Sequence, residues 1–153
     1  VDYVNATYGT SVEAQRINTG SFTDVNQAKE TAISMIESGC DVITPMANDA
    51  SVGVMEAAEE KNVMAIGCGL GQDASAPTTT QTIVVKDVAI AYDVTYDMYT
   101  KGELKATEVE TYGANRGVVY VTDWFVDVDH EVKSKFDETM TKLANGEITI
   151  NIE

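Results

Sequence analysis

The sequence has few of the residues that metal-dependent and hydrolytic chemistry requires. Its 153 residues include one histidine, His130, and two cysteines, Cys40 and Cys68. Neither cysteine lies in a C-x-x-C or Cys/His cluster, so the sequence predicts no zinc site and no disulfide scaffold. A Ser-His-Asp or Cys-His mechanism would depend on His130, which has no recognisable nucleophile motif near it. We therefore expect no catalytic residue, no metal, no cofactor and two free thiols.

Basic residues are also scarce. Ten Lys and Arg stand against 25 Asp and Glu, which gives a formal net charge of −15 at pH 7. Nucleic acids and anionic membrane surfaces both attract clusters of Lys and Arg. The charge therefore argues against both as partners, and its simplest role is to keep the protein soluble.

Long hydrophobic runs are missing. No apolar stretch approaches the roughly 20 residues of a membrane-spanning helix. The first ten residues, VDYVNATYGT, resemble neither a signal peptide nor a transit peptide. Because the chain starts without Met inside a patterned segment, we expect a processed or truncated form of a longer protein.

Short apolar runs alternate with amphipathic helical patterns along the chain. We expect helices at 1–8, 24–38, 51–61, 87–101 and 130–144, and strands at 13–18, 41–46, 63–66, 81–85, 105–110, 117–122 and 148–152. Asp24, Ser51 and Asp129 are the expected helix caps. This alternation predicts an α/β fold in which a parallel sheet is flanked by helices. No internal repeat or linker divides the chain.

Ligands of open parallel sheets bind outside the carboxyl ends of the strands. Four segments fall there: GSFTD (20–24), ANDAS (47–51), GCGLGQ (67–72) and VVKD (84–87). Cys40 begins one strand and Cys68 ends another, so we expect the two thiols at opposite edges of the sheet.

The glycine-rich segment suggests a dinucleotide site but does not fit one. A Rossmann fingerprint needs G-x-G-x-x-G at the start of a helix, because the pyrophosphate sits on that helix N-terminus. Here Gln72 occupies the third glycine position, and DASAPTTT follows in place of a helix start. The pattern therefore argues against dinucleotide binding and leaves a flexible surface turn as the simplest interpretation.

An ordered set of motifs has a better match. GSFTD (20–24), CDVITPMA (40–47), EAAEE (56–60), AIGCG (65–69), VVKD (84–87) and GEITI (146–150) follow one another along nearly the whole chain. In order and spacing they resemble the basic membrane protein (BMP) family. Its members are substrate-binding proteins of ABC importers, and the purine-nucleoside receptor is the best-known type.

The resemblance implies a type I periplasmic-binding-protein fold with two α/β lobes and a ligand cleft between them. Residues 1–153 would form a single lobe, the C-terminal part of the two-lobe protein. Residues 87–110 would be a crossover segment that packs on the other lobe. Without that lobe we expect Val88, Val94 or Met98 to be exposed or to form a dimer contact.

The resemblance also implies ligand-binding roles in the first two loops. Phe22 would stack on a flat ring of the ligand, although it could instead fill a gap in the core. Asp24 would face the ligand or only cap its helix. Asn48 takes the place of a family glycine and would, with Asp49, line the pocket or simply form the turn.

Two further positions complete the implied site. Lys86 would bind a ribose hydroxyl or an anionic group, or form an ordinary ion pair. Gly69 stands where the family has an aspartate suited to ribose hydroxyls, so Gln72 or Asp73 would have to supply the acceptor. Trp124 and Phe125 would pack at the hinge between the lobes or contact the ligand.

The resemblance thus implies an extracytoplasmic, lipid-anchored or periplasmic protein that delivers a nucleoside-like solute to an ABC transporter permease and performs no chemistry. A ligand-sensing regulatory domain of the same fold is an alternative. A carboxylate-based α/β enzyme is a third reading.

Overall fold

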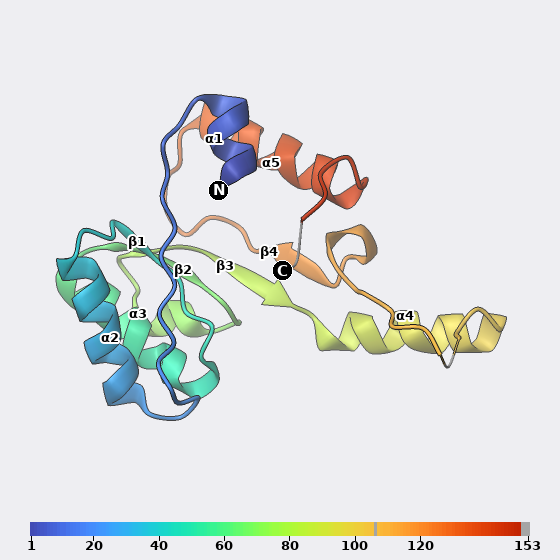
Figure 1. The fold of residues 1–153 in the computed structure, drawn as a ribbon, viewed down its shortest axis with the longest axis horizontal. Helices are drawn as coiled ribbons and strands as arrows, with labels where there is room; N and C mark the ends of the chain where they lie inside the picture. Colours follow the sequence, from blue (N-terminus) through green and yellow to red (C-terminus); the bar gives the residue numbers. More distant parts are fainter. Residues whose placement is uncertain (106, 151–153) are drawn as a thin grey trace.

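A four-stranded sheet lies at the centre of the protein. The computed structural model describes residues 1–105 and 107–150. The sheet has the order β1-β2-β3-β4, with β1 at Val42–Ile43, β2 at Met64–Gly67, β3 at Thr80–Lys86 and β4 at Val119–Val121. β1, β2 and β3 are parallel. The predicted α/β class is therefore confirmed, and the helices flank the sheet as Figure 1 shows.

β4 departs from the prediction of an all-parallel sheet, because it runs antiparallel to β3. The chain leaves β3 at its carboxyl end and returns to the same end, where the Asp87 N–H donates to the Val118 carbonyl at 2.7 Å. A strand that starts at that edge must run back along β3. Sequence spacing alone does not reveal this direction.

The predicted helices all form. They are α1 (Asp2–Tyr8), α2 (Val25–Glu37), α3 (Ser51–Lys61), α4 (Val88–Lys101) and α5 (His130–Ala144). Asp24 Oδ1 accepts from the Gln27 N–H at 3.0 Å, and Asp129 Oδ1 accepts from the Glu131 N–H at 2.7 Å, as predicted for caps. The prediction for Ser51 is wrong: it is the first residue of α3, and its Oγ accepts from the Ala47 N–H at 3.1 Å.

Three predicted strands do not form in the described residues. Residues 13–18 are extended but have no strand partner, and 105, 107–110 and 148–150 are likewise outside the sheet. Residues 106, 151 and 152 of those predicted strands lie outside the described part. An alternating pattern yields a strand only where a neighbouring edge accepts its hydrogen bonds, and that depends on tertiary packing.

Small side chains form the principal core. Its buried members come mainly from α2, α3, β1 and β2: Ala28, Ala32, Ile43, Ala47, Ala50, Val54, Met55, Ala57, Ala58, Ala65 and Ala76. Alanines let α2 and α3 approach each other closely, and the helices lie together beside the sheet in Figure 1. This packing brings the N-terminal ends of α2 and α3 together.

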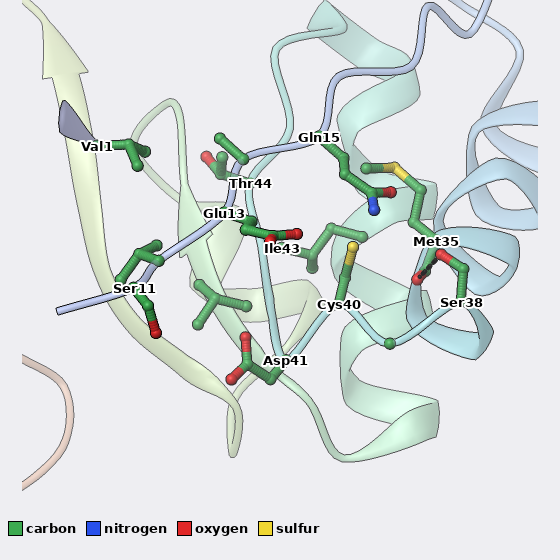
Figure 2. Close-up of a pocket in the computed structure, with 14 residues that line it drawn as sticks. Val1, Ser11, Glu13, Gln15, Met35, Ser38, Cys40, Asp41, Ile43 and Thr44 are labelled. Carbon is green, nitrogen blue, oxygen red and sulfur yellow. Dashed lines mark hydrogen bonds between the residues drawn. The ribbon is translucent and has the colours of Figure 1, made fainter. Parts of the chain in front are cut away.

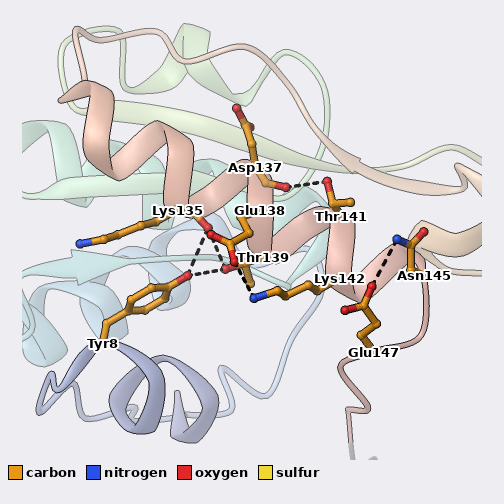
Figure 3. A network of polar contacts seen from close by, with 9 residues as sticks. All are labelled: Tyr8, Lys135, Asp137, Glu138, Thr139, Thr141, Lys142, Asn145 and Glu147. Atoms are coloured by element: carbon orange, nitrogen blue, oxygen red, sulfur yellow. Dashed lines mark hydrogen bonds and ion pairs between the residues drawn. The ribbon is translucent and has the colours of Figure 1, made fainter.

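The two terminal helices form a separate layer. α1 lies against α5, where Tyr8 Oη is 3.0 Å from Thr139 Oγ1 and the Lys135 ammonium lies 5.5 Å from the Tyr8 ring centroid (Figure 3). Trp124 also packs on this layer, edge to face against Phe136 with ring centroids 5.4 Å apart. Helices at opposite ends of the sequence are thus held side by side.

α4 projects away from the sheet (Figure 1) and has two different faces. Of the three residues named as candidates for exposure, Val88 is exposed, Val94 is half-buried and Met98 is buried. The exposed face carries four large side chains spaced by three or four residues: Val88, Tyr92, Tyr96 and Tyr99. Within the part of the chain described, no helix is long and apolar enough to cross a membrane.

Candidate functional site

The loop before α2 and the turn before α3 are held together at the carboxyl edge of the sheet. The Ala50 N–H donates to the Phe22 carbonyl at 3.1 Å, which joins residues 20–24 to residues 48–50. Ser21 Oγ accepts from the N–H groups of Thr23 and Asp24 and so tightens the loop. With its backbone fixed, Phe22 leaves 70% of its surface exposed. The alternative in which Phe22 fills the core is therefore wrong.

The turn after β1 places two polar side chains at the surface. Asn48 and Asp49 begin a short 3₁₀ turn, η1 (Asn48–Ala50), and both are exposed. Asn48 has φ of +51°, a left-handed conformation that asparagine tolerates better than most residues. The buried hydrogen bond from the Ala47 N–H to Ser51 Oγ holds this turn at the start of α3.

The glycine loop after β2 is closed by one side chain. Gln72 Oε1 accepts from the Cys68 N–H at 2.8 Å, and Gln72 Nε2 faces the Cys68 carbonyl at 3.5 Å. Gly69 has φ of +149°, where side chains are strained. A Cβ there would also lie 3.4 Å from Gln72 Nε2. Gln72 thus serves the loop's own structure, and Gly69 shapes it.

The end of β3 lies next to this loop. Residues 68–70 and 85–88 line an open hollow of about 340 Å³. Lys86 is exposed on its wall and has no hydrogen bond or ion pair to the described residues. Asp87 caps α4, with Oδ1 accepting from the N–H groups of Ala89 and Ile90. The structure therefore brings Gly69 and Lys86 together as the strand-end rule predicts.

Two exposed apolar residues at this edge were not predicted. Met46 follows β1 and Leu70 lies within the glycine loop beside Lys86. The sequence did offer a signal for Leu70, because a large apolar side chain in a glycine-rich surface loop gains nothing from exposure to solvent and therefore suggests a binding role. Phe22, Met46 and Leu70 are thus large apolar side chains left exposed in the strand-end loops.

A hydrogen-bonded carboxylate anchors the chain between the glycine loop and β3. Glu59 of α3 accepts from the N–H and hydroxyl groups of both Thr78 and Thr79, at distances from 2.6 to 3.2 Å. The Thr78 hydroxyl, above all, holds the pKa of Glu59 below its usual range. This contact ties the residues just before β3 to α3.

A larger hollow, of about 640 Å³, lies at the opposite edge of the sheet. Residues 11–15 pass beside the start of β1 and leave a gap lined by Glu13, Cys40 and Asp41, among others (Figure 2). It lies at the amino end of the parallel strands, away from the predicted loops. Cys40 here and Cys68 at the other edge are both free, as predicted.

The donor groups of the described residues do not suggest a metal site. Within residues 1–105 and 107–150, no three His, Cys, Asp or Glu side chains gather where they could share a cation. The carboxyl edge instead offers a ring, an ammonium group and backbone groups. Such an edge can bind and orient a small molecule.

Solved structures share this fold. A solute-binding protein of an ABC transporter system from Aeropyrum pernix K1 superposes with a TM-score of 0.78 and 20% identity, over 99% of this chain and 51% of that one. An ABC transporter solute-binding protein from Conexibacter woesei DSM 14684 superposes with a TM-score of 0.68 and 18% identity, over 92% of this chain and 47% of that one. A transcriptional activator of the comK gene from Bacillus halodurans superposes with a TM-score of 0.73 and 23% identity, over 86% of this chain and 46% of that one.

Sequence comparison identifies the family. Basic membrane protein A of Borreliella afzelii is 27% identical over 134 residues, which are 86% of this chain and 41% of that protein. The chain thus spans about half or less of the length of the relatives it matches. The family model for PnrA-like ABC transporter substrate-binding proteins, Bmp, matches residues 1–153. The chain therefore belongs to the Bmp family of ABC transporter substrate-binding proteins.

Proposed function

We propose that this chain is one lobe of a two-lobe binding protein that delivers a small, ring-containing, nucleoside-like solute to an ABC transporter permease. The observation that carries the proposal is the exposed ring of Phe22, held at the same sheet edge as Lys86. An aromatic face and a cation that both face one ligand are groups that can fix a flat polar solute. The protein would bind its solute and perform no chemistry.

In this proposal the ligand meets Phe22, Asn48 and Asp49 on one side and the hollow of Gly69 and Lys86 on the other. Asp24 and Gln72 support the loops, since both side chains already bond to backbone N–H groups. The second lobe closes over the same edge and supplies the remaining contacts. Solute-binding proteins of this family act outside the cytoplasm, and a lipid anchor upstream of Val1 belongs to the same proposal.

The exposed face of α4 supports the division into lobes. Val88, Tyr92, Tyr96 and Tyr99 form an unpaired apolar row on the segment 87–110. We assign this row to the contact with the other lobe, and the alternative is a dimer contact between two copies. Hydroxyl-radical footprinting should show Tyr92 protected in the whole protein at every concentration. Protection that appears only at high concentration would favour the dimer.

The function is tested by calorimetric titration of the whole protein with nucleosides, bases, flavins and sugars. Phe22→Ala should weaken the binding of a ring ligand about two- to tenfold, because stacking contributes about 0.5–1.5 kcal/mol. It should leave the melting temperature unchanged. Val132→Ala is the control, since Val132 is also an exposed apolar residue but lies on α5, away from the candidate site. Equal effects of both substitutions would contradict the proposal.

A sensing role is the second candidate, and the similarity to the comK transcriptional activator favours considering it. The same lobe would bind its ligand but control a partner in place of feeding a permease. The segment encoded upstream of Val1 distinguishes the two: a lipoprotein cysteine supports import, and a regulatory domain supports sensing.

A further inference from the structure

The hollow beside Lys86 offers positive charge to a ligand. Lys86 ends β3, its side chain is exposed, and within the described residues it has no ion pair or hydrogen bond. An ammonium group carries three N–H donors and no acceptor. Its best partner is therefore a group with several acceptor oxygens.

The acidic residue on the wall of the hollow, Asp87, is engaged by its own helix. Asp87 Oδ1 accepts from the Ala89 N–H at 3.0 Å and from the Ile90 N–H at 3.2 Å. These N–H groups form the positive end of the α4 dipole, which stabilises the carboxylate where it is. Asp87 is thus satisfied by its own helix and is not paired with Lys86.

The glycine loop on the other wall carries no acidic side chain at Gly69, where the positive φ disfavours any side chain. Gly69 has φ of +149°, and a Cβ there would lie 3.4 Å from Gln72 Nε2. Gln72 fills that space because its amide bonds to both backbone groups of Cys68. The loop therefore contributes backbone and the apolar Leu70 to the hollow, but no carboxylate.

The overall charge of −15 does not cancel the local effect. At physiological ionic strength the Debye length is about 8 Å, so distant acids are largely screened. The charges that line the hollow therefore decide which ligand charge it prefers, and the cation in its lining is Lys86.

From this arrangement we infer that the solute places an anionic group, a carboxylate or a phosphate, in the hollow formed by Gly69, Leu70 and Lys86. The solute is then a ring acid or a nucleotide-like compound, and a neutral nucleoside binds less well. The inference rests on the proposed function for the ring end of the solute.

Matched pairs of compounds test the inference in calorimetric titrations of the whole protein. Uridine is compared with uridine 5′-monophosphate, and uracil with orotate, so that one pair adds a phosphate and the other a carboxylate to the same ring. At least one acid should bind about tenfold or more tightly than its neutral partner, as a charge-assisted hydrogen bond predicts. The pair that shows the gain identifies the kind of anion.

Substitutions then assign the gain to Lys86. Lys86→Met should reduce the preference for the acid over its neutral partner to less than about twofold, whereas Lys86→Arg should keep the preference. Lys61→Met is the control, because Lys61 pairs with Glu37 where α2 and α3 end, away from this edge. Melting curves establish that each variant is folded. Equal binding within both pairs, or a preference that survives Lys86→Met, would overturn the inference.

The two proposals can fail separately. If the ring compounds bind and depend on Phe22 but show no preference for acids, the function stands and the inference falls. If no ring compound binds, inorganic phosphate is titrated while the reductively ¹³C-methylated lysines are followed by NMR. A saturable shift confined to Lys86 then supports the anion site without the proposed function, and its absence refutes both.

Discussion

Gly53 lies directly against the backbone of Val25, so closely that a Cβ on Gly53 would fall 2.0 Å from the Val25 carbonyl oxygen. Val25 is the first residue of α2, and Gly53 lies in the first turn of α3. The contact brings together the two helix starts that carry Phe22 and Asn48. One glycine thereby sets the spacing of two loops of the candidate site.

Gly53→Ala should therefore destabilise the protein strongly. A methyl group cannot fit against a carbonyl oxygen without moving a helix, and overpacking of this kind costs about 1–3 kcal/mol or more. Thermal unfolding should show a fall in Tm of several degrees. Gly113→Ala is the control, because a Cβ at Gly113 would meet only Asn115 Oδ1 at 3.5 Å. An unchanged Tm for Gly53→Ala would disprove the close contact.

Glu59 should make stability depend on pH. Because hydrogen bonds lower its folded-state pKa from the usual 4.5, its contribution is complete above that value and is lost as the pH falls through the lowered pKa. Glu59→Gln should lower Tm by a few degrees at pH 7, and the difference in Tm between the wild type and the variant should narrow towards pH 3. Glu30→Gln, an exposed carboxylate on α2, should show no comparable gap. A gap that stays constant with pH would contradict this role.

Thr122 connects β3 to the chain after β4. Its Oγ1 accepts from the Ile83 N–H at 3.1 Å and lies 3.3 Å from the hydroxyl of Thr82, which is buried. Thr122→Val should cost about 1–3 kcal/mol, because it leaves the Ile83 N–H without its acceptor. Chemical denaturation measures this loss, and Thr111→Val at an exposed loop position is the control. Equal stability of the two variants would refute the role.

Gly69 should resist substitution. Its φ of +149° makes Gly69→Ala strained by about 1–3 kcal/mol, and this strain lies in the backbone, because the added Cβ would meet Gln72 Nε2 at an ordinary contact distance of 3.4 Å. We expect a lower Tm and a loss of ligand affinity, since the loop that faces Lys86 must shift. Gly113→Ala again serves as the control. Wild-type affinity together with wild-type Tm would show that the loop tolerates a side chain there.

Some of the candidate site could be predicted from sequence. The loops that hold Phe22, Gly69 and Lys86 follow from the rule that ligands bind at the carboxyl ends of parallel strands. The role of Gln72 in closing the glycine loop could not be predicted, because its hydrogen bond from the Cys68 N–H exists only in the folded loop. The exposure of Lys86 also required the structure, since a lysine after two valines fits either a buried or a surface position.

The sequence by itself determined the helices, their caps at Asp24 and Asp129, the α/β class and the family, because these depend on contacts within a few residues or on the order of motifs. Only the tertiary structure decided the antiparallel direction of β4, the unpaired state of residues 13–18 and the fit of Gly53 on Val25. Each of these depends on which distant segment becomes a neighbour. That choice depends on packing of the whole chain, which local pattern does not encode.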